Sequence, residues 1–364
     1  MAFSNNDYVP IPLSSLKIGM EIDYDIYREN NGEFLLLCKD VTITDELLER
    51  FHRLTYPTYN IYVPNSKYEL MVDDRRKLHN RIKRNAYYKN YEQVKETASG
   101  MLDEILKADS VPLEIVEDLT ATVHKQVETM EISHIIQSIN SVRKVDEYLH
   151  THCVNVALLN GIIGRWLKMD DDNLASLVKA GLLHDIGKLK IPNRILNKPT
   201  RLTEEEFALI MNHPVYSHDM LTRSGYTDEK ILKCVIQHHE RVNGMGYPSG
   251  LNLKEITEFA RITSISDVYD AMVTKRAYKE AHSPFDILSW FSEGCYSELD
   301  FRYVTVFIES MADEFKGKKV LLSDGREGTV MFVHANNIAN PIVRSNGEVI
   351  NTSADLRCVS ILDE

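Results

Sequence analysis

The sequence predicts a mainly helical protein, with a helical middle between a small mixed β/α segment and a small β segment. Apolar residues between Val111 and about Phe315 recur at three- and four-residue spacing, which is the period of an amphipathic helix. From Lys318 to Glu364 they alternate instead, as is typical of strands. The length of 364 residues exceeds one typical domain, so several folded units are expected.

Residues 1–65 are expected to form a mixed β/α domain with a regulatory or dimerising role. Two β-like runs, Glu21 to Tyr27 and Phe34 to Cys38, flank an Asn-Gly pair that suits a hairpin turn, and a short helix is expected from Asp45 to Leu54. Residues 66–140 are expected to be a helical connector, containing a long exposed helix from Asp73 to Lys95. Its Lys and Arg residues indicate a solvated face, with a partner or dimer surface as the alternative.

Residues 141–315 are expected to be an all-helical catalytic bundle, and residues 316–364 a small β domain. Within the bundle, Thr203 and Glu206 match a capping box, and Pro214 places the preceding His213 near a helix end. In the last segment, Asp324-Gly325 and Asn346-Gly347 predict hairpin turns.

Composition limits the classes of partner and the compartment. A net charge of −12 argues against broad electrostatic binding to nucleic acid or anionic lipid, although a small phosphorylated ligand is still compatible. The five cysteines are scattered without CxxC spacing, which indicates free thiols in a reducing compartment. No run approaches the roughly 20 apolar residues of a membrane span, and no signal peptide is recognisable. A cytoplasmic location is therefore expected.

Histidine and aspartate residues in the helical middle suggest a metal site. The candidates are His152, His184, Asp185, His213, His238, His239 and Asp267. Imidazoles and carboxylates suit borderline divalent metals such as iron, manganese, zinc or nickel, and seven ligands exceed what one ion with an open position needs. Two metal ions fit the count better, with Asp185 as a carboxylate that could bridge them.

Taken singly, His152 or His213 is more often a satisfied polar residue at a helix end. The adjacent pairs His184-Asp185 and His238-His239 are different, because side chains about 100° apart on a helix seldom both face a core without polar partners. After the second pair, Gly244, Gly246 and Pro248 are expected to shape the backbone rather than to do chemistry.

Three longer motifs carry a resemblance to a known family. They are LLHDIGKLKIP from Leu182, HHERVNGMGYP from His238 and SDVYDAMVTKRAYKEAHSP from Ser266. Between about Val145 and about Ser310 the chain closely resembles the HD-GYP family of cyclic di-GMP phosphodiesterases, a branch of the HD phosphohydrolases. The resemblance implies an HD-type helical bundle that carries the same seven residues as ligands of two metal ions.

The resemblance also implies which cofactors bind. Iron or manganese is expected, with nickel, zinc or cobalt as alternatives. Some family members have a Glu one turn before the first His, which serves a third metal, but Tyr148 stands there in this chain and Glu147 is one residue off. Two ions are therefore expected rather than three.

Substrate contacts follow from the same resemblance. Lys188 and Asp185 are the implied catalytic residues, with the Lys188 ammonium near the scissile phosphate. Arg276 and Lys279 would hold phosphate or guanine groups, Asp270 resembles an acidic residue near guanine, and Tyr247 would stack or donate a hydrogen bond. Without the motif, Arg276 and Lys279 would be read as an exposed helix face.

The activity implied by the resemblance is metal-dependent hydrolysis of cyclic di-GMP to pGpG, with continuation to GMP left open, through attack by a metal-bridging hydroxide. Two alternatives remain. One is an HD-type phosphohydrolase of another nucleotide or of pGpG alone, and the other is a non-catalytic receptor or scaffold that binds cyclic di-GMP or a diguanylate cyclase. A homodimer and the input sensed by the N-terminal domain are also left open.

Overall fold

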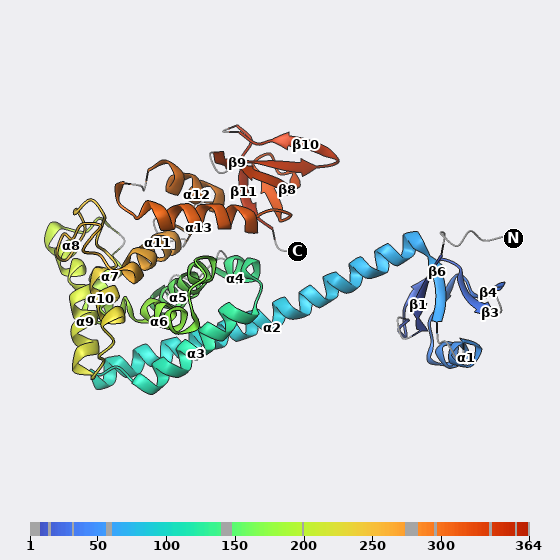
Figure 1. Ribbon diagram of the computed structural model, residues 1–364, viewed down its shortest axis with the longest axis horizontal. Helices are drawn as coiled ribbons and strands as arrows, with labels where there is room; N and C mark the ends of the chain where they lie inside the picture. Colours follow the sequence, from blue (N-terminus) through green and yellow to red (C-terminus); the bar gives the residue numbers. More distant parts are fainter. Residues whose placement is uncertain are drawn as a thin grey trace. The chain divides into compact units, whose positions relative to one another are not determined.

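The computed structural model divides the chain into two compact units, Met1–Ala86 and Tyr87–Glu364 (Figure 1). It describes residues 8–13, 16–30, 33–55, 60–139, 148–198, 200–273, 283–294, 297–334, 337–353 and 355–362. For residues 65–86 only the backbone is described. The predicted fold class is confirmed, because helices dominate and small sheets occupy both ends of the chain.

The first unit is built around a four-stranded antiparallel sheet. Its strand order is β1-β6-β3-β4, with β1 at Tyr8–Pro12, β6 at Asn60–Pro64, β3 at Ile26–Asn30 and β4 at Glu33–Cys38. Short strands β2 (Glu21–Ile22) and β5 (Val41–Thr42) pair separately, and helix α1 covers Asp45–Thr55. Buried Ile26, Phe51 and Ile61 belong to the core of this unit. The expected Asn31-Gly32 turn lies outside the described residues.

Helix α2 is one continuous helix over Asn65–Ala108, and the boundary between the units falls inside it. From Tyr87 onward one face of α2 joins the core of the second unit, with Tyr87, Tyr91 and Val94 all buried. The expectation of an exposed connector helix is wrong for these residues. Their spacing of four and three residues is that of a helix face that packs, and the many charges around them concealed it.

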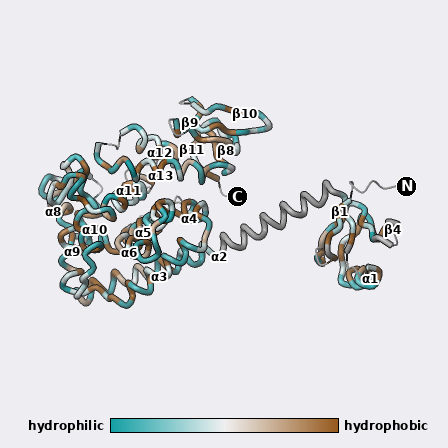
Figure 2. Tube along the Cα trace, viewed as in Figure 1, coloured by the Kyte–Doolittle hydropathy of each residue, from teal (hydrophilic) through white to brown (hydrophobic). Residues whose placement is uncertain are grey.

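The second unit is a helical bundle whose helices carry both hydrophobic (brown) and hydrophilic (teal) residues (Figure 2). Helix α5 (Tyr148–Trp166) packs against α6 (Asp171–Leu183) and α11 (Glu258–Val273). The remaining helices are α3 (Leu113–Thr129), α4 (Ile132–Ile139), α7 (Asn193–Leu196), α8 (Glu204–Met211), α9 (His213–Arg223), α10 (Glu229–Gln237), α12 (Pro284–Glu293) and α13 (Phe301–Glu314). A 3₁₀ helix, Ile186–Lys190, follows α6.

A five-stranded antiparallel sheet follows the bundle and packs on α12 and α13. Its order is β10-β9-β8-β7-β11, with β7 at Lys319–Leu322, β8 at Glu327–His334, β9 at Asn337–Ser345, β10 at Glu348–Asn351 and β11 at Cys358–Ile361. Both predicted turns connect strands of this sheet. Asn346 and Gly347 both have positive φ, as a two-residue type I′ hairpin turn requires.

Candidate metal centre

The seven predicted ligands come from helices α5, α9 and α11 and from the residues that directly follow α6 and α10. His152 lies on α5, His184 and Asp185 lie between α6 and the 3₁₀ helix, His213 begins α9, His238 and His239 follow α10, and Asp267 lies on α11. The capping box at Thr203 and Glu206 starts α8, which ends just before His213. His184, His213, His238 and His239 thus lie at or just beyond helix ends, whereas His152 and Asp267 lie within helices.

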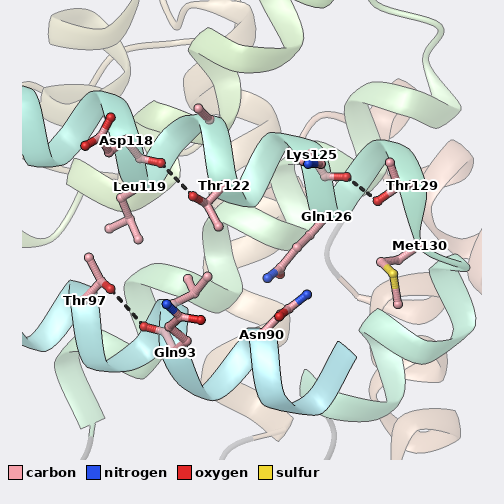
Figure 3. Close-up of a pocket in the computed structure, with 12 residues that line it drawn as sticks. Asn90, Gln93, Thr97, Asp118, Leu119, Thr122, Lys125, Gln126, Thr129 and Met130 are labelled. Atoms are coloured by element: carbon pink, nitrogen blue, oxygen red, sulfur yellow. Dashed lines mark hydrogen bonds between the residues drawn. The ribbon is translucent and has the colours of Figure 1, made fainter. Parts of the chain in front are cut away.

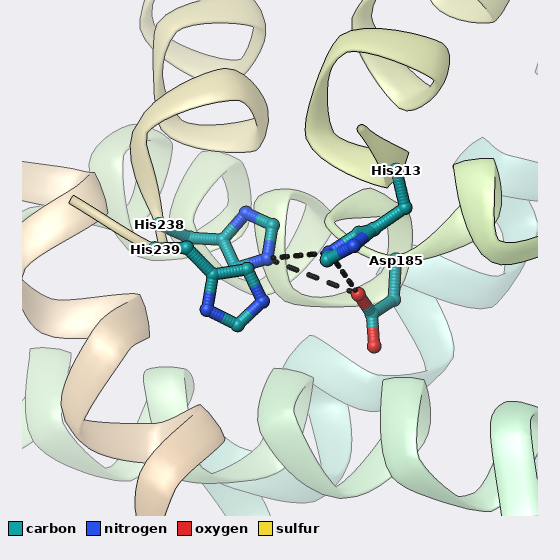
Figure 4. Close-up of side chains that lie close together, drawn as sticks. All are labelled: Asp185, His213, His238 and His239. Carbon is teal, nitrogen blue, oxygen red and sulfur yellow. Dashed lines mark hydrogen bonds and ion pairs between the residues drawn. The ribbon is translucent and has the colours of Figure 1, made fainter. Parts of the chain in front are cut away.

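The Asp185 carboxylate stands at the centre of this group and is fully buried. Its Oδ1 atom lies 3.0 Å from His213 Nε2 and 3.8 Å from His238 Nε2 (Figure 4). Its Oδ2 atom lies 3.2 Å from His152 Nε2 and 3.4 Å from His184 Nε2. Each carboxylate oxygen therefore faces its own pair of imidazoles, which is the arrangement that a bridging ligand between two ions needs.

Asp267 and His239 complete the group on the side of α11. Asp267 Oδ1 is 3.1 Å from His152 Nε2, and Asp267 Oδ2 is 3.7 Å from His239 Nδ1. The structure thus brings all seven predicted residues into one cluster. Two sets of possible ligand atoms share Asp185: one contains His152 and His184, and the other contains His213, His238 and His239.

The second ring nitrogens determine which tautomer each histidine adopts. His184, His213 and His238 each direct Nδ1 at a backbone carbonyl oxygen three residues earlier, at 2.7 Å. A carbonyl only accepts hydrogen bonds, so Nδ1 carries the proton and Nε2 presents a lone pair to the cluster. This is the protonation state in which imidazole binds metal.

Lone pairs therefore face one another at short range. The Nε2 atoms of His213 and His238 are 3.4 Å apart, and those of His184 and His152 are 3.3 Å apart. Within the described residues, Asp185 Oδ1 accepts no hydrogen bond although it is buried. Buried acceptors without donors are costly, so the residues present fit divalent cations between them.

Burial and neighbouring charges favour the same protonation states as these hydrogen bonds. Burial lowers the pKa of His238 and His239 well below the usual histidine range, which keeps both rings neutral. Burial alone would raise the pKa of Asp185, but the adjacent Lys188 ammonium counters it, and that pKa lies well below its usual range. Neutral imidazoles around an ionised carboxylate are a metal-binding set.

Asp270 holds the ring of His152 rather than facing open solvent. It is fully buried; one oxygen accepts a hydrogen bond from His152 Nδ1 at 2.7 Å, and the other accepts from Asn155 Nδ2 at 2.9 Å. The resemblance did not imply this contact. The sequence feature that could have predicted this contact is the three-residue spacing from Asp267 to Asp270 and from His152 to Asn155. This spacing places each pair on one face of a helix.

The residues expected to contact substrate are described in part. The Lys188 ammonium forms an ion pair with Asp185 Oδ2 and is mostly buried. The Tyr247 ring stacks on His239, with centroids 4.6 Å apart. Arg276 and Lys279 lie outside the described residues, as do Glu147 and the side chain of Tyr148.

Backbone packing fixes the two motif loops, through residues that the motif reading did not single out. A Cβ at Gly187 would lie 2.1 Å from the His213 carbonyl oxygen, so only glycine lets the HD turn pack on α9. Ser217 secures this contact, since its hydroxyl accepts from Gly187 N and donates to the His184 carbonyl. In the second loop, buried Glu240 accepts hydrogen bonds from Ser249 N and Leu251 N.

Comparison with known proteins identifies this cluster's domain. The family model described as HD domain matches residues 113–289. This match covers 177 of the 364 residues, a segment that we call the HD domain. The HD domain contains all seven clustered residues, and it begins at α3, earlier than the predicted catalytic boundary at residue 141.

The chain is also similar to three named bacterial phosphodiesterases. The chain is 32% identical over 233 residues to a cyclic di-GMP phosphodiesterase of Pseudomonas aeruginosa, covering 64% of this chain and 54% of that protein. It is 29% identical to 3'3'-cGAMP-specific phosphodiesterase 3 of Vibrio cholerae, covering 54% and 42%. It is 36% identical to a cyclic di-GMP phosphodiesterase of Thermotoga maritima, covering 41% and 40%. The chain thus spans about half the length of these relatives or less.

None of the helices in the described part of the chain combines the length and the apolar character that crossing a bilayer requires.

Proposed function

We propose that this chain is a metal-dependent phosphodiesterase that hydrolyses cyclic di-GMP to pGpG. The observation that supports it most directly is the buried Asp185 carboxylate, whose two oxygens face separate pairs of histidines. That arrangement fits two divalent ions bridged by one carboxylate, with Asp267 and His239 completing the ligands. Two such ions, when bound, supply a polarised water nucleophile and offset charge on a phosphoryl oxygen.

Iron or manganese is the proposed metal. The donors are five imidazoles and two carboxylates without a thiolate, a set that suits borderline first-row ions rather than calcium or a soft copper(I) ion. Shared Asp185 supports two ions, and the presence of Tyr148 in place of Glu disfavours a third.

Side chains around the ligands are proposed to bind the substrate. The ammonium of Lys188 lies beside Asp185, where it would meet a non-bridging phosphate oxygen and stabilise developing negative charge. Tyr247 caps His239 and would present its ring or hydroxyl to a base. Arg276 and Lys279 are proposed to add positive charge for a doubly anionic ligand, and Asp270 is proposed to act through His152 as well as near guanine.

Two other functions remain as outcomes of the test. The 3'3'-cGAMP-specific relative makes a different cyclic dinucleotide, or pGpG itself, a reasonable alternative substrate. A receptor or scaffold that binds cyclic di-GMP without cleaving it, and that engages a diguanylate cyclase, is the second alternative. Further cleavage of pGpG to GMP is the open second step of the proposed reaction, and a cytoplasmic location is part of the same proposal.

The test is anaerobic purification with metal analysis, followed by chromatography of the products from cyclic di-GMP, 3'3'-cGAMP and pGpG. We expect about two iron or manganese ions per chain, as a bridged binuclear site requires. The double variant His184→Ala/Asp185→Ala should lose both metal and turnover. A matched control is His218→Ala/Asp219→Ala, which removes another adjacent His-Asp pair, on α9, where Asp219 is exposed.

Full turnover in the His184→Ala/Asp185→Ala variant would refute the site. Metal-loaded wild-type protein that binds cyclic di-GMP but releases no product would instead favour the receptor. Faster cleavage of 3'3'-cGAMP or pGpG than of cyclic di-GMP would replace the proposed substrate and leave the metal centre intact.

A further inference from the structure

A chain of three buried hydrogen bonds joins helix α2 to the metal centre. The Tyr91 hydroxyl donates to Asn155 Oδ1 at 2.6 Å, and Asn155 Nδ2 donates to Asp270 Oδ1 at 2.9 Å. The other oxygen of Asp270 accepts from His152 Nδ1 at 2.7 Å. We call Tyr91, Asn155 and Asp270 the relay. It connects residues that are far apart in the sequence and ends on a proposed metal ligand.

The donor at the start of the relay fixes the orientation of its middle member. Because Tyr91 donates, the amide oxygen of Asn155 faces α2 and its NH₂ group faces Asp270. Without the Tyr91 hydroxyl, Asn155 Oδ1 would be buried without this donor. An amide that turned to relieve that loss would place its oxygen against the Asp270 carboxylate, and Asp270 would then hold His152 less well.

Helix α2 is packed differently on its two faces at this level. The face that carries Tyr87, Tyr91 and Val94 is buried in the core of the second unit. Asn90, Gln93 and Thr97, with Val94 at the edge of the buried face, border a cavity of about 560 Å³ between α2 and α3, which is lined by both polar and apolar side chains (Figure 3). The cavity leaves space into which α2 can shift. Tyr91, on the buried face of the same helix, would move with it.

We propose that Tyr91 is a positioning residue for His152, so that the docking of α2 on the HD domain sets how tightly the ion beside His152 is held. The proposal rests on the metal-binding role proposed above, and it makes α2 a regulatory element of the metal centre. Tyr91 lies five residues after the unit boundary on a helix that begins in the first unit. Displacement of α2 would therefore change metal affinity through Asn155 and Asp270.

The variant Tyr91→Phe tests this proposal, with Tyr87→Phe as its matched control. Both changes remove one buried hydroxyl from the same face of α2 and keep the ring, and the two rings stack on each other. In the described part of the chain, no hydrogen bond joins the Tyr87 hydroxyl to the relay. Titration of metal-free protein with Mn²⁺ under anaerobic conditions, followed by calorimetry, measures the two binding steps separately.

We expect Tyr91→Phe to weaken one of the two Mn²⁺ steps about three- to tenfold, less than removal of a direct partner of a ligating histidine, which typically costs 10–100-fold. Tyr87→Phe should match wild type. With substrate, kcat should fall while KM changes little, and Asn155→Ala should reproduce the weakened step. Raising Mn²⁺ concentration should restore turnover in both variants.

Unchanged Mn²⁺ affinity in Tyr91→Phe and Asn155→Ala would overturn the relay, and so would an equal loss in Tyr87→Phe. Thermal unfolding of each metal-free variant checks that folding is intact, and an effect that follows lost stability rather than Mn²⁺ affinity also counts against the proposal. Failure of the proposed function is distinguishable, because wild type would then bind Mn²⁺ normally and cleave no cyclic dinucleotide.

Discussion

Replacing Asp270 by Asn changes the charge behind His152 and almost nothing else. The side chain keeps its size, but one carboxylate oxygen becomes an NH₂ group. Both partners of Asp270, His152 Nδ1 and Asn155 Nδ2, donate hydrogen bonds to it. Whichever way the new amide turns, its NH₂ group meets a donor, so either one of the two buried hydrogen bonds is lost or the donor must become an acceptor.

The size of the effect follows from these contacts. A hydrogen bond to a charged group contributes about 1.5–3 kcal/mol, which corresponds to roughly 10- to 100-fold in an equilibrium constant at about 1.4 kcal/mol per tenfold. If the NH₂ group faces His152, Nδ1 must accept, and the ring proton moves to Nε2, where it blocks metal binding. We therefore expect Asp270→Asn to lower the affinity for one of the two metal ions by about 10- to 100-fold, which is the range known for partners of ligating histidines.

Competition between the protein and a coloured chelator for Mn²⁺ measures this loss. The control is Asp313→Asn, which removes an exposed carboxylate that pairs with Lys316 on the surface of α13. Asp270→Asn should also lose turnover at limiting metal and regain part of it at high metal. Two Mn²⁺ ions bound with wild-type affinity in Asp270→Asn would refute the reasoning that this carboxylate fixes the His152 tautomer.

Two further predictions concern stability. Gly187→Ala should lower the free energy of unfolding by about 1–3 kcal/mol, because the new methyl group meets backbone atoms of α9. In thermal unfolding the control Gly100→Ala, which has open space at its Cβ, should not lose stability. A Gly187→Ala variant as stable as wild type would contradict the packing argument. Asp300→Asn should cost about 1–3 kcal/mol at neutral pH, since Arg261 and Arg302 bind this buried carboxylate. Burial raises the pKa of Asp300, but these hydrogen bonds outweigh it and lower the pKa. Its stabilisation is therefore present above an unfolded pKa of about 3.9 and is lost as pH falls through the lower folded value. Urea unfolding across pH should show the difference from wild type shrinking below about pH 4, and a pH-independent difference would exclude the linkage.

Much of the fold could be predicted because its signals are local. The helical spacing of apolar residues, the capping box at Thr203 and the turn at Asn346-Gly347 depend on neighbours along the chain, and the structure shows the corresponding elements. The burial of α2 from Tyr87 onward was missed, because a helix with many charges can still present one apolar face, and only its packing partner decides whether that face is covered.

Five histidines and two aspartates, in motifs that resemble HD-GYP proteins, could be identified from the amino-acid order alone as side chains available for chemistry. The fold was needed to show that Asp185 lies between two sets of imidazoles, that Asp270 holds His152, and that Tyr91 on α2 reaches the same network. The physical reason is that a histidine's tautomer and a carboxylate's partners depend on atoms that meet across the fold. Spacing along the sequence does not specify these contacts, but burial makes each hydrogen bond or unpaired polar group cost or contribute more free energy than it would in water.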